Sequence, residues 1–320
     1  MPAQALRKPF RFGAGIPGIL PRASFIDSVR AIEGLGYSTL LLSDHLVDQF
    51  APFSALGVAA GVTTALRLGM FVLNNDLRHP AVLAQELATL DQLSDGRLEI
   101  GIGAGWNRPE YDSAGLAFDS SGTRIDRMGE AVTVLKALFS PGPTTFTGRH
   151  YKIDGFADLA RPLQLPCPPI MVGGGGQKTL SFAAREADII GLAPRAIKPG
   201  VSDVRSCMAA GTDVKIGWVK AAAGDRWASL EFNTYPTFHP ITVTDTPGPV
   251  VARLTETLNK RHGIDLTEEE VMESPHVFIG SIEGMVDKCE QIRERHGISY
   301  IFVGDEFRQF APVVERLAGR

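Results

Sequence analysis

The chain has 320 residues, of which 44% are hydrophobic and 21% are charged, and its formal net charge is −4. This composition argues against a disordered chain and against a strongly basic protein built to coat nucleic acid. A chain of this length buries roughly three quarters of its unfolded surface, so it needs no disulfide or metal to hold a core.

Short apolar runs alternate with longer amphipathic segments along the chain. The apolar runs predict strands at 10–16, 37–42, 66–73, 98–102, 169–172, 188–191, 230–234 and 299–303. The amphipathic spacing predicts helices at 22–35, 52–64, 80–93, 124–139, 178–186, 249–261 and 282–295, and a last helix that contains 312–317. Strands and helices therefore alternate through most of the sequence.

Eight strand–helix units predict an α/β fold, a (β/α)8 TIM barrel with insertions after strands four and six. Parallel strands buried on both faces read as continuous apolar runs, and the length suits a barrel of ~250 residues with insertions. The insertions are 140–169, with a hairpin around 145–153, and an irregular stretch at 193–213. The alternative is a doubly wound open sheet, but the turn at 13–18 carries a proline and lacks the third glycine of dinucleotide spacing. We expect a single domain over 1–320.

The sequence lacks the patterns that are typical of secretion, of membrane spanning and of metal binding. Segment 1–11 has no apolar run of a secretory signal, and no stretch of about 18 apolar residues occurs. Cys167, Cys207 and Cys289 form no C-x-x-C pair, and the histidines have no H-E-x-x-H spacing. We expect a reduced cytoplasmic protein with no metal site, no membrane contact and no nucleic-acid partner.

Polar and glycine-rich clusters follow five of the expected strands. They are Ser43-Asp44-His45, Asn74-Asn75-Asp76, the run from Gly101 to Asn107, the run from Gly173 to Lys178, and Pro194-Arg195. The carboxyl ends of barrel strands converge at one face, where barrel enzymes place their active sites. The sequence therefore predicts a site built from these clusters.

Four consecutive glycines lie between an expected strand and an expected helix. Such a turn lets backbone N–H groups approach an anion, and the helix N-terminus adds partial positive charge. The residues of this predicted anion site are Gly173, Gly174, Gly175, Gly176, Gln177 and Lys178. The alternative is a flexible or tightly packed turn with no ligand.

The other candidate side chains are suited to holding a ring and moving a proton. His45 can donate or pass a proton near neutral pH, or it is a structural strand-end histidine. Trp106 offers a flat surface, Asn107 both donates and accepts, and Gly103 lets a planar ligand approach the backbone.

These motifs, in this order, resemble the bacterial luciferase-like monooxygenase superfamily of flavin- and deazaflavin-dependent TIM barrels. The likeness spans nearly the whole chain and is closest to an actinobacterial branch that uses coenzyme F420. The segments that carry it are 43–45, 78–80, 90–97, 101–106, 124–127, 146–151, 172–176, 275–276, 280–281, 297–300 and 310–312.

The resemblance implies roles for specific residues. Asp44 matches a residue near the polar edge of the cofactor ring, and His45 one near its reactive carbon. The stretch Phe71, Val72, Leu73 and Asn74 matches a bulge that backs the ring, often with a non-proline cis peptide. The glycine run from Gly173 to Lys178 matches a phosphate-binding loop, and relatives imply a homodimer.

One departure bears on the direction of the reaction. Several sugar- or alcohol-oxidising relatives carry a glutamate at about the place of Trp106, and an indole cannot exchange a proton at neutral pH. This favours reduction of a C=C or C=N bond, although Glu110 is nearby.

We therefore hypothesise an F420-dependent oxidoreductase that acts on a small molecule. His45 and Asn107 would be the catalytic donors, and Trp106 and Gly103 would lie against the ring. Lys178 and Arg195 would bind the anionic tail of F420. The alternatives are an FMN-dependent monooxygenase and a non-catalytic barrel that binds a phosphorylated ligand.

Overall fold

The structure is a computed structural model that describes residues 8–198 and 200–320. Most of the segment in which no secretory signal is expected, residues 1–7, lies outside the described residues. The described C-terminus returns to the start of the first strand, where the Phe10 N–H donates to the Arg320 carbonyl at 3.0 Å.

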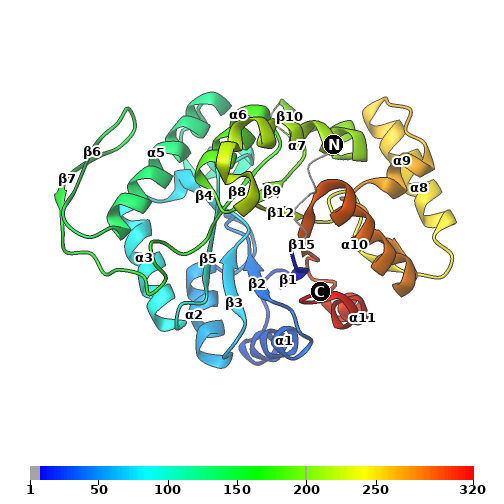
Figure 1. Cartoon of the computed structure of the whole chain (residues 1–320), viewed down its shortest axis with the longest axis horizontal. Helices are drawn as coiled ribbons and strands as arrows, with labels where there is room; N and C mark the ends of the chain where they lie inside the picture. Colours follow the sequence, from blue (N-terminus) through cyan, green and yellow to red (C-terminus); the bar gives the residue numbers. More distant parts are fainter. Residues whose placement is uncertain (1–7, 199) are drawn as a thin grey trace.

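Eight parallel strands form a closed ring at the centre of the molecule (Figure 1). In ring order they are β1 (Arg11–Ala14), β2 (Thr39–Leu42), β3 (Arg67–Met70), β5 (Leu98–Gly103), β8 (Ile170–Gly174), β9 (Ile189–Leu192), β12 (Glu231–Thr234) and β15 (Ile298–Phe302). The ring is closed because β15 pairs with β1, while the two-residue β4 (Leu73–Asn74) continues beyond β3 alongside β5. The predicted barrel is confirmed, and the open sheet is not formed.

Helices surround the ring and bury its outer face (Figure 1). They are α1 (Arg22–Gly34), α2 (Pro52–Val62), α3 (Pro80–Leu93), α5 (Ser121–Phe139), α6 (Gln177–Glu186), α7 (Ala209–Ala223), α10 (Ile282–His296) and α11 (Phe307–Leu317). Prolines open α2 and α3, where the missing N–H costs no helical hydrogen bond.

Side chains fill the inside of the barrel. A Cβ on Gly13 would lie 2.8 Å from Cδ1 of Leu41, and one on Gly69 would lie 2.7 Å from its Cδ2. These two glycines therefore make room for Leu41, which packs with Met171 and Tyr300 in an inner cluster. Because the interior is packed, a ligand has room only at an end of the barrel.

The first insertion has the predicted form and the second does not. Strands β6 (Thr144–Thr147) and β7 (Lys152–Phe156) make the expected antiparallel hairpin. The stretch 193–213, predicted to be irregular, instead contains the hairpin of β10 (Arg195–Lys198) and β11 (Val201–Asp203) and the 3-10 helix η2 (Val204–Cys207), and α7 begins within it. Helix α7 has two glycines and several β-branched residues, so local propensity hides it, and packing against α6 supports it.

Two further elements were not predicted. One is the short helix α4 (Arg108–Ala114) after β5. The other is a third excursion, after β12, of which only α8 (Gly248–His262) was predicted, at 249–261. It also contains β13 (Thr242–Val243), α9 (Glu268–Glu273) and β14 (Ile279–Gly280). This excursion packs in a second hydrophobic cluster around Val251, Leu258 and Val271, which it shares with Val204 and Cys207 of η2, and it forms a third insertion. Two 3-10 helices, η1 (Asn75–Leu77) and η3 (Gly224–Ser229), complete the elements.

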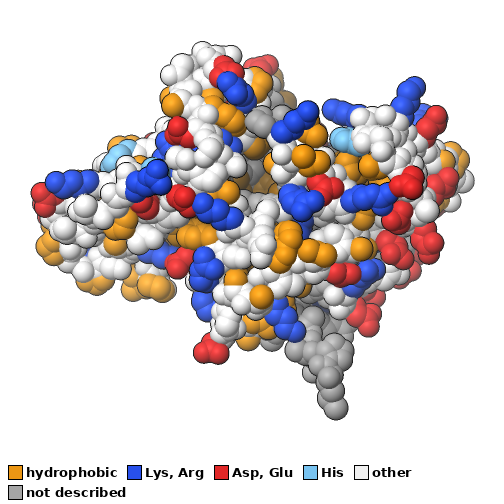
Figure 2. Space-filling model, turned by 90° about the horizontal axis from the view of Figure 1, so that it is seen from above, with side chains coloured by type: hydrophobic (Ala, Val, Ile, Leu, Met, Phe, Trp, Pro, Cys, Tyr) orange, Lys and Arg blue, Asp and Glu red, His pale blue; other side chains and the backbone are white. Residues whose placement is uncertain are grey.

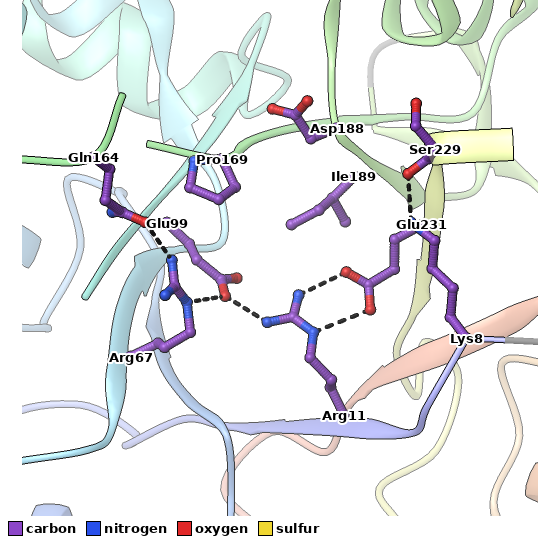
Figure 3. A pocket seen from close by; sticks show the side chains of 10 residues that line it. All are labelled: Lys8, Arg11, Arg67, Glu99, Gln164, Pro169, Asp188, Ile189, Ser229 and Glu231. Carbon is purple, nitrogen blue, oxygen red and sulfur yellow. Dashed lines mark hydrogen bonds and ion pairs between the residues drawn. The ribbon is translucent and has the colours of Figure 1, made fainter. Parts of the chain in front are cut away.

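A charged cavity of about 320 Å³ lies at the end of the barrel where the strands begin (Figure 3). Glu99 accepts from Arg11 and Arg67 at 2.5 and 2.6 Å, and Arg11 also pairs with Glu231 at 2.7 Å. Burial alone would raise the pKa of Glu99, but the two arginines hold it below its ordinary value. Since these charges neutralise one another at the amino-terminal end, we assign the cluster to stability.

The surface mixes charges of both signs. On the face drawn in Figure 2, Lys and Arg side chains are interspersed with Asp and Glu, and hydrophobic side chains lie between them. Within 8–198 and 200–320, no helix has the length and apolar character needed to cross a bilayer. The three cysteines are free thiols, and Cys207 and Cys289 are buried.

Candidate active site

The clusters predicted from the sequence meet at the carboxyl end of the barrel. His45 follows β2, Asn74 ends β4, Gly103 ends β5, and Gly174 ends β8. Because all these strands are parallel, their ends open onto the same mouth. The charged cavity of Figure 3 lies at the opposite end.

His45 is held by a carboxylate that the sequence reasoning noted only as nearby. Its Nδ1 lies 2.8 Å from Oε1 of Glu110. The side-chain amide of Asn107 donates to the same oxygen, and the backbone N–H of Leu46 donates to Oε2 at 3.3 Å. A carboxylate only accepts, so this geometry places a proton on Nδ1 of His45 and leaves Nε2 for a ligand.

The sequence around Glu110 has a pattern that could have predicted the start of a helix. Asn107 is the N-cap of α4, Pro109 opens the helix, and Glu110 stands at the third helical position. An N-cap residue followed three positions later by glutamate is a helix-start pattern. Here the two side chains bond each other and hold His45. The Asn107 amide, predicted to be a free donor, is thus already engaged.

Trp106 is a large exposed aromatic beside this group. Its ring meets the His45 ring edge-on at a centroid distance of 5.7 Å, and the residue is 62% exposed. A ligand at the mouth could cover it.

Asp44 is tied into the wall of the mouth. Its carboxylate accepts from Arg78 at 2.6 and 3.1 Å and from the backbone N–H of Asn74 at 3.1 Å. The Oδ1 of Asn74 accepts from the Tyr111 hydroxyl at 2.9 Å. These bonds link the ends of β2 and β4 to α4, so Asp44 and Asn74 shape the site. Arg78 and Tyr111 had not been predicted as its members.

The floor of the mouth is apolar. The Phe71–Val72 peptide is cis, as the resemblance implies. A Cβ on Gly103 would lie 2.7 Å from Val72 Cγ2, and one on Gly173 would lie 3.3 Å from its Cγ1. These glycines therefore accommodate Val72 and not a planar ligand directly, which corrects the role predicted for Gly103.

Phe71 and Leu73 point to different parts of the core. The Phe71 ring packs against Phe302 and Tyr235 at centroid distances of 4.5 and 5.3 Å. The Leu73 side chain is 1% exposed in the main hydrophobic core, so it cannot contact a ligand at the mouth. Of the predicted ring-backing stretch, Phe71 and Val72 supply the floor.

The glycine run serves packing at three of its four positions. Besides Gly173 under Val72, a Cβ on Gly174 would lie 2.4 Å from Thr179 Cγ2, and one on Gly175 would lie 2.3 Å from the Pro194 carbonyl oxygen. Only Gly176 faces open space, with nothing within 4 Å of its Cβ position. The alternative of a packed turn thus accounts for most of the run.

The start of α6 nevertheless has the features of an anion site. Gly176 is its N-cap, with no side-chain capping bond, and Gln177 is its first residue. The first N–H groups of a helix have no partner within the helix, so they are available to an anion.

The two predicted cations are paired with carboxylates. Lys178 Nζ lies 2.6 Å from Asp126, and Arg195 lies 2.5 Å from Asp203. Both cationic side chains are about half exposed.

A buried lysine that the sequence reasoning missed supports the glycine loop. Lys215 of α7 is 1% exposed, and its Nζ donates to the Ala193 carbonyl at 2.6 Å. The Ala193 N–H in turn donates to the Gly174 carbonyl at 3.0 Å. Burial lowers the pKa of Lys215. The described residues contain no group of three or more His, Cys, Asp or Glu side chains that could hold a metal ion.

Residues 9–212 match the family described as luciferase-like monooxygenase. The chain belongs to this family, which confirms the resemblance seen in the motifs.

Curated relatives include users of both cofactors. An F420-dependent glucose-6-phosphate dehydrogenase of Kineococcus radiotolerans is 36% identical over 164 residues, or 49% of this chain and 48% of that protein. An FMNH2-dependent dimethylsulfone monooxygenase of Pseudomonas putida is 32% identical over 142 residues, or 43% of this chain and 39% of that protein. The chain spans about half the length, or less, of these relatives.

Solved structures share the fold over nearly the whole chain. The coenzyme F420-dependent tetrahydromethanopterin reductase of Methanopyrus kandleri superposes with a TM-score of 0.75, at 20% identity over 97% of this chain and 98% of that one. An F420-dependent secondary alcohol dehydrogenase superposes with a TM-score of 0.72, at 19% identity and the same coverage.

Proposed function

We propose that the protein is an F420-dependent oxidoreductase that transfers a hydride between the deazaflavin ring and a small organic substrate. The observation that carries the proposal is the His45–Glu110 pair at the mouth of the barrel, across from the uncapped start of α6. F420-dependent relatives and structural neighbours support the same cofactor.

The residues of the mouth fit such a cofactor. The open position at Gly176 and the uncapped helix start suit a phosphate, with Gln177 adjacent. The apolar floor of Phe71 and Val72 suits one face of a planar ring. When bound, the cofactor supplies a ring carbon that gives or takes a hydride.

The protein's own part is to position and exchange a proton. Glu110 fixes the His45 ring through Nδ1, so Nε2 is left for the mouth. Once Nε2 has taken up a proton from solvent, the imidazolium, held beside the Glu110 carboxylate, can donate that proton to the substrate. Asn107 holds Glu110 in place and is a positioning residue rather than a second donor. We propose reduction of a C=C or C=N bond, because it needs a proton donor such as the His45 imidazolium. Oxidation of an alcohol is less favoured, because Trp106 cannot take a proton from the alcohol as a glutamate in that place could.

An FMN-dependent monooxygenase is the second candidate. It is favoured by the family's description and by the relative from Pseudomonas putida. The phosphate site would serve FMN equally, so the two candidates differ in what binds the rest of the cofactor.

We also propose that residues 1–320 form a single domain, that the protein is a homodimer and that it works in the cytoplasm. These proposals rest on the continuous barrel and on the family resemblance. Light scattering of the purified protein tests the dimer directly, since a mass near 34.4 kDa would contradict it.

The catalytic proposal is tested with His45→Ala. We expect the single-turnover rate with reduced F420 to fall by more than about tenfold, while the melting temperature stays close to that of the wild type. A large fall in melting temperature with a near-normal rate would make His45 a structural residue.

A further inference from the structure

Four large hydrophobic side chains stand exposed on the rim of the mouth near His45. They are Ile19, Leu46, Val47 and Trp106, which are 56%, 54%, 55% and 62% exposed, and we call them the apolar wall. They come from the loops that follow β1, β2 and β5. Exposed apolar side chains gathered beside a site mark a place where a ligand is covered.

The three loops lie together. The Trp106 ring contacts His45, which precedes Leu46 in the chain. A Cβ on Gly18 would lie 3.7 Å from the Asp48 carbonyl oxygen, so the loop that carries Ile19 meets the loop that carries Leu46 and Val47.

The second loop is fixed in a shape that keeps its apolar side chains outside. The Ser43 hydroxyl donates to Gln49 Oε1 at 2.7 Å, and Gln49 Nε2 donates back to the Ser43 carbonyl at 2.9 Å. The Gln49 N–H donates to the Val47 carbonyl at 2.7 Å. These hydrogen bonds fix the conformation of the loop, and in this conformation the side chains of Leu46 and Val47 are exposed to solvent.

Charge divides the mouth into two sides. The loops at 15–21, 43–51 and 104–107 contain no lysine or arginine. Their two carboxylates are Asp44, which Arg78 neutralises, and the exposed Asp48, which has no ion-pair partner among the described residues. The cations Lys178 and Arg195 stand on the other side, after β8 and β9. The nearest cation that follows Trp106 in the chain, Arg108, is paired with Asp112 at 3.2 Å. An anionic substrate would therefore meet the unneutralised Asp48 at the wall and would have to displace a carboxylate to gain a counter-charge.

We propose that the substrate is an uncharged, predominantly apolar small molecule that packs against the apolar wall, and not a phosphorylated or carboxylated one. This inference rests on the proposed function, in which His45 faces the substrate. It assigns the substrate to the wall and the anionic tail of the cofactor to the opposite side.

The test is a series of 3-alkyl-2-cyclohexenones, from methyl to pentyl, with 3-(4-carboxybutyl)-2-cyclohexenone and glucose 6-phosphate as anionic probes. Dissociation constants are measured by calorimetry on the full chain, without cofactor and with saturating F420. We expect affinity to rise roughly two- to fourfold per methylene and the carboxylated probe to bind at least about tenfold more weakly than the pentyl compound.

Matched variants assign the effect to the wall. Val47→Ser should flatten the dependence on chain length, whereas Val214→Ser, at a residue 52% exposed on α7, should leave it unchanged. Affinity that is independent of chain length, tighter binding of either anionic probe, or equal effects of the two variants would overturn the proposal. Because one arm needs no cofactor, an apolar series that binds while F420 does not would refute the cofactor and leave the wall standing.

Discussion

Glu110 determines which nitrogen of His45 faces the mouth. Its carboxylate is 7% exposed and receives donors from His45, Asn107 and the Leu46 backbone. An imidazole without this partner could turn and could take either tautomer. At the scale of single residues, the proposed chemistry therefore depends on an acid that does not itself touch the substrate.

Glu110→Gln keeps the size of the side chain and removes the charge. We expect single turnover with F420 to slow by about tenfold or more, because the proton on Nδ1 is no longer held by a carboxylate, while the dissociation constant of F420 changes by less than about twofold.

The control is Asp112→Asn on the same helix, where the carboxylate is 58% exposed and, among the described residues, forms an ion pair with Arg108 alone. Rates that fall equally in both variants would assign the loss to α4 as a whole, and an unchanged rate in Glu110→Gln would remove Glu110 from the mechanism.

The sequence predicted which side chains lie at the mouth, but it predicted their hydrogen bonds and ion pairs less well. His45 and Trp106 lie at the mouth as predicted, because strand ends are legible in the sequence. The ion pair of Lys178 was not predicted, because Asp126 lies on a helix far away in the sequence. The hydrogen bond of Asn107 to Glu110 was not predicted, because α4 was missed. The fully buried side chain of Leu73 shows the same limit, since a bulge changes which residues face inward.

At the scale of elements, the start of helix α6 is where the proposed phosphate site can be tested. Three glycines before it are required for packing, and only the position at Gly176 is free for a ligand. Gly174→Val would push against Thr179 and displace the helix, so that variant cannot separate phosphate binding from folding.

Gly176→Ala separates the effect on phosphate binding from the effect on folding. Its φ of −97° suits alanine, and its Cβ would enter open space, so the melting temperature should not fall. If a phosphate approaches the backbone here, the added methyl should weaken F420 binding by about tenfold. Fluorescence titration measures this, with Gly57→Ala in α2, where a Cβ also meets open space, as the control. Unaltered F420 affinity in Gly176→Ala would place the phosphate elsewhere.

Element prediction succeeded where strands were continuous apolar runs and failed where tertiary contacts decide. All eight barrel strands were predicted near their observed positions. Helix α7 was missed because its glycines and β-branched residues weaken the local signal. The β10–β11 hairpin was missed because both strands are short and neither is buried. In the excursion after β12 only the helix at 249–261 was predicted, because local periodicity does not show the hydrophobic cluster in which the excursion packs.

At the scale of the whole molecule, we assign the amino-terminal end of the barrel to stability and the carboxyl end to the proposed active site. Glu99 joins Arg11 and Arg67 at the amino-terminal end and also accepts from the Tyr300 hydroxyl at 3.3 Å. A buried carboxylate between two arginines is costly to remove, since Arg67 loses its ion pair and Arg11 keeps only the one with Glu231 among the described residues.

Glu99→Gln should therefore lower the free energy of unfolding by about 3 kcal/mol at pH 7 and leave F420 affinity unchanged. Because the folded pKa of Glu99 is lowered, its contribution is complete above the unfolded value of 4.5 and is lost as pH falls through the folded value. In urea titrations, the difference in the free energy of unfolding between variant and wild type should therefore be constant above pH 4.5 and should narrow below it. Glu294→Gln, exposed on α10, is the control, and a pH-independent gap would contradict the assignment.

The central claim is that this barrel uses F420, and paired titrations of the wild-type protein with F420 and FMN test it most directly. F420 carries an anionic lactyl–glutamyl tail beyond its phosphate, and Lys178 and Arg195 stand past the glycine loop, where they can exchange Asp126 and Asp203 for that tail. We predict tighter binding of F420 than of FMN, with a preference that shrinks as salt screens the tail. Equal affinities, or tighter binding of FMN, would contradict the account and make the protein a flavin-dependent monooxygenase.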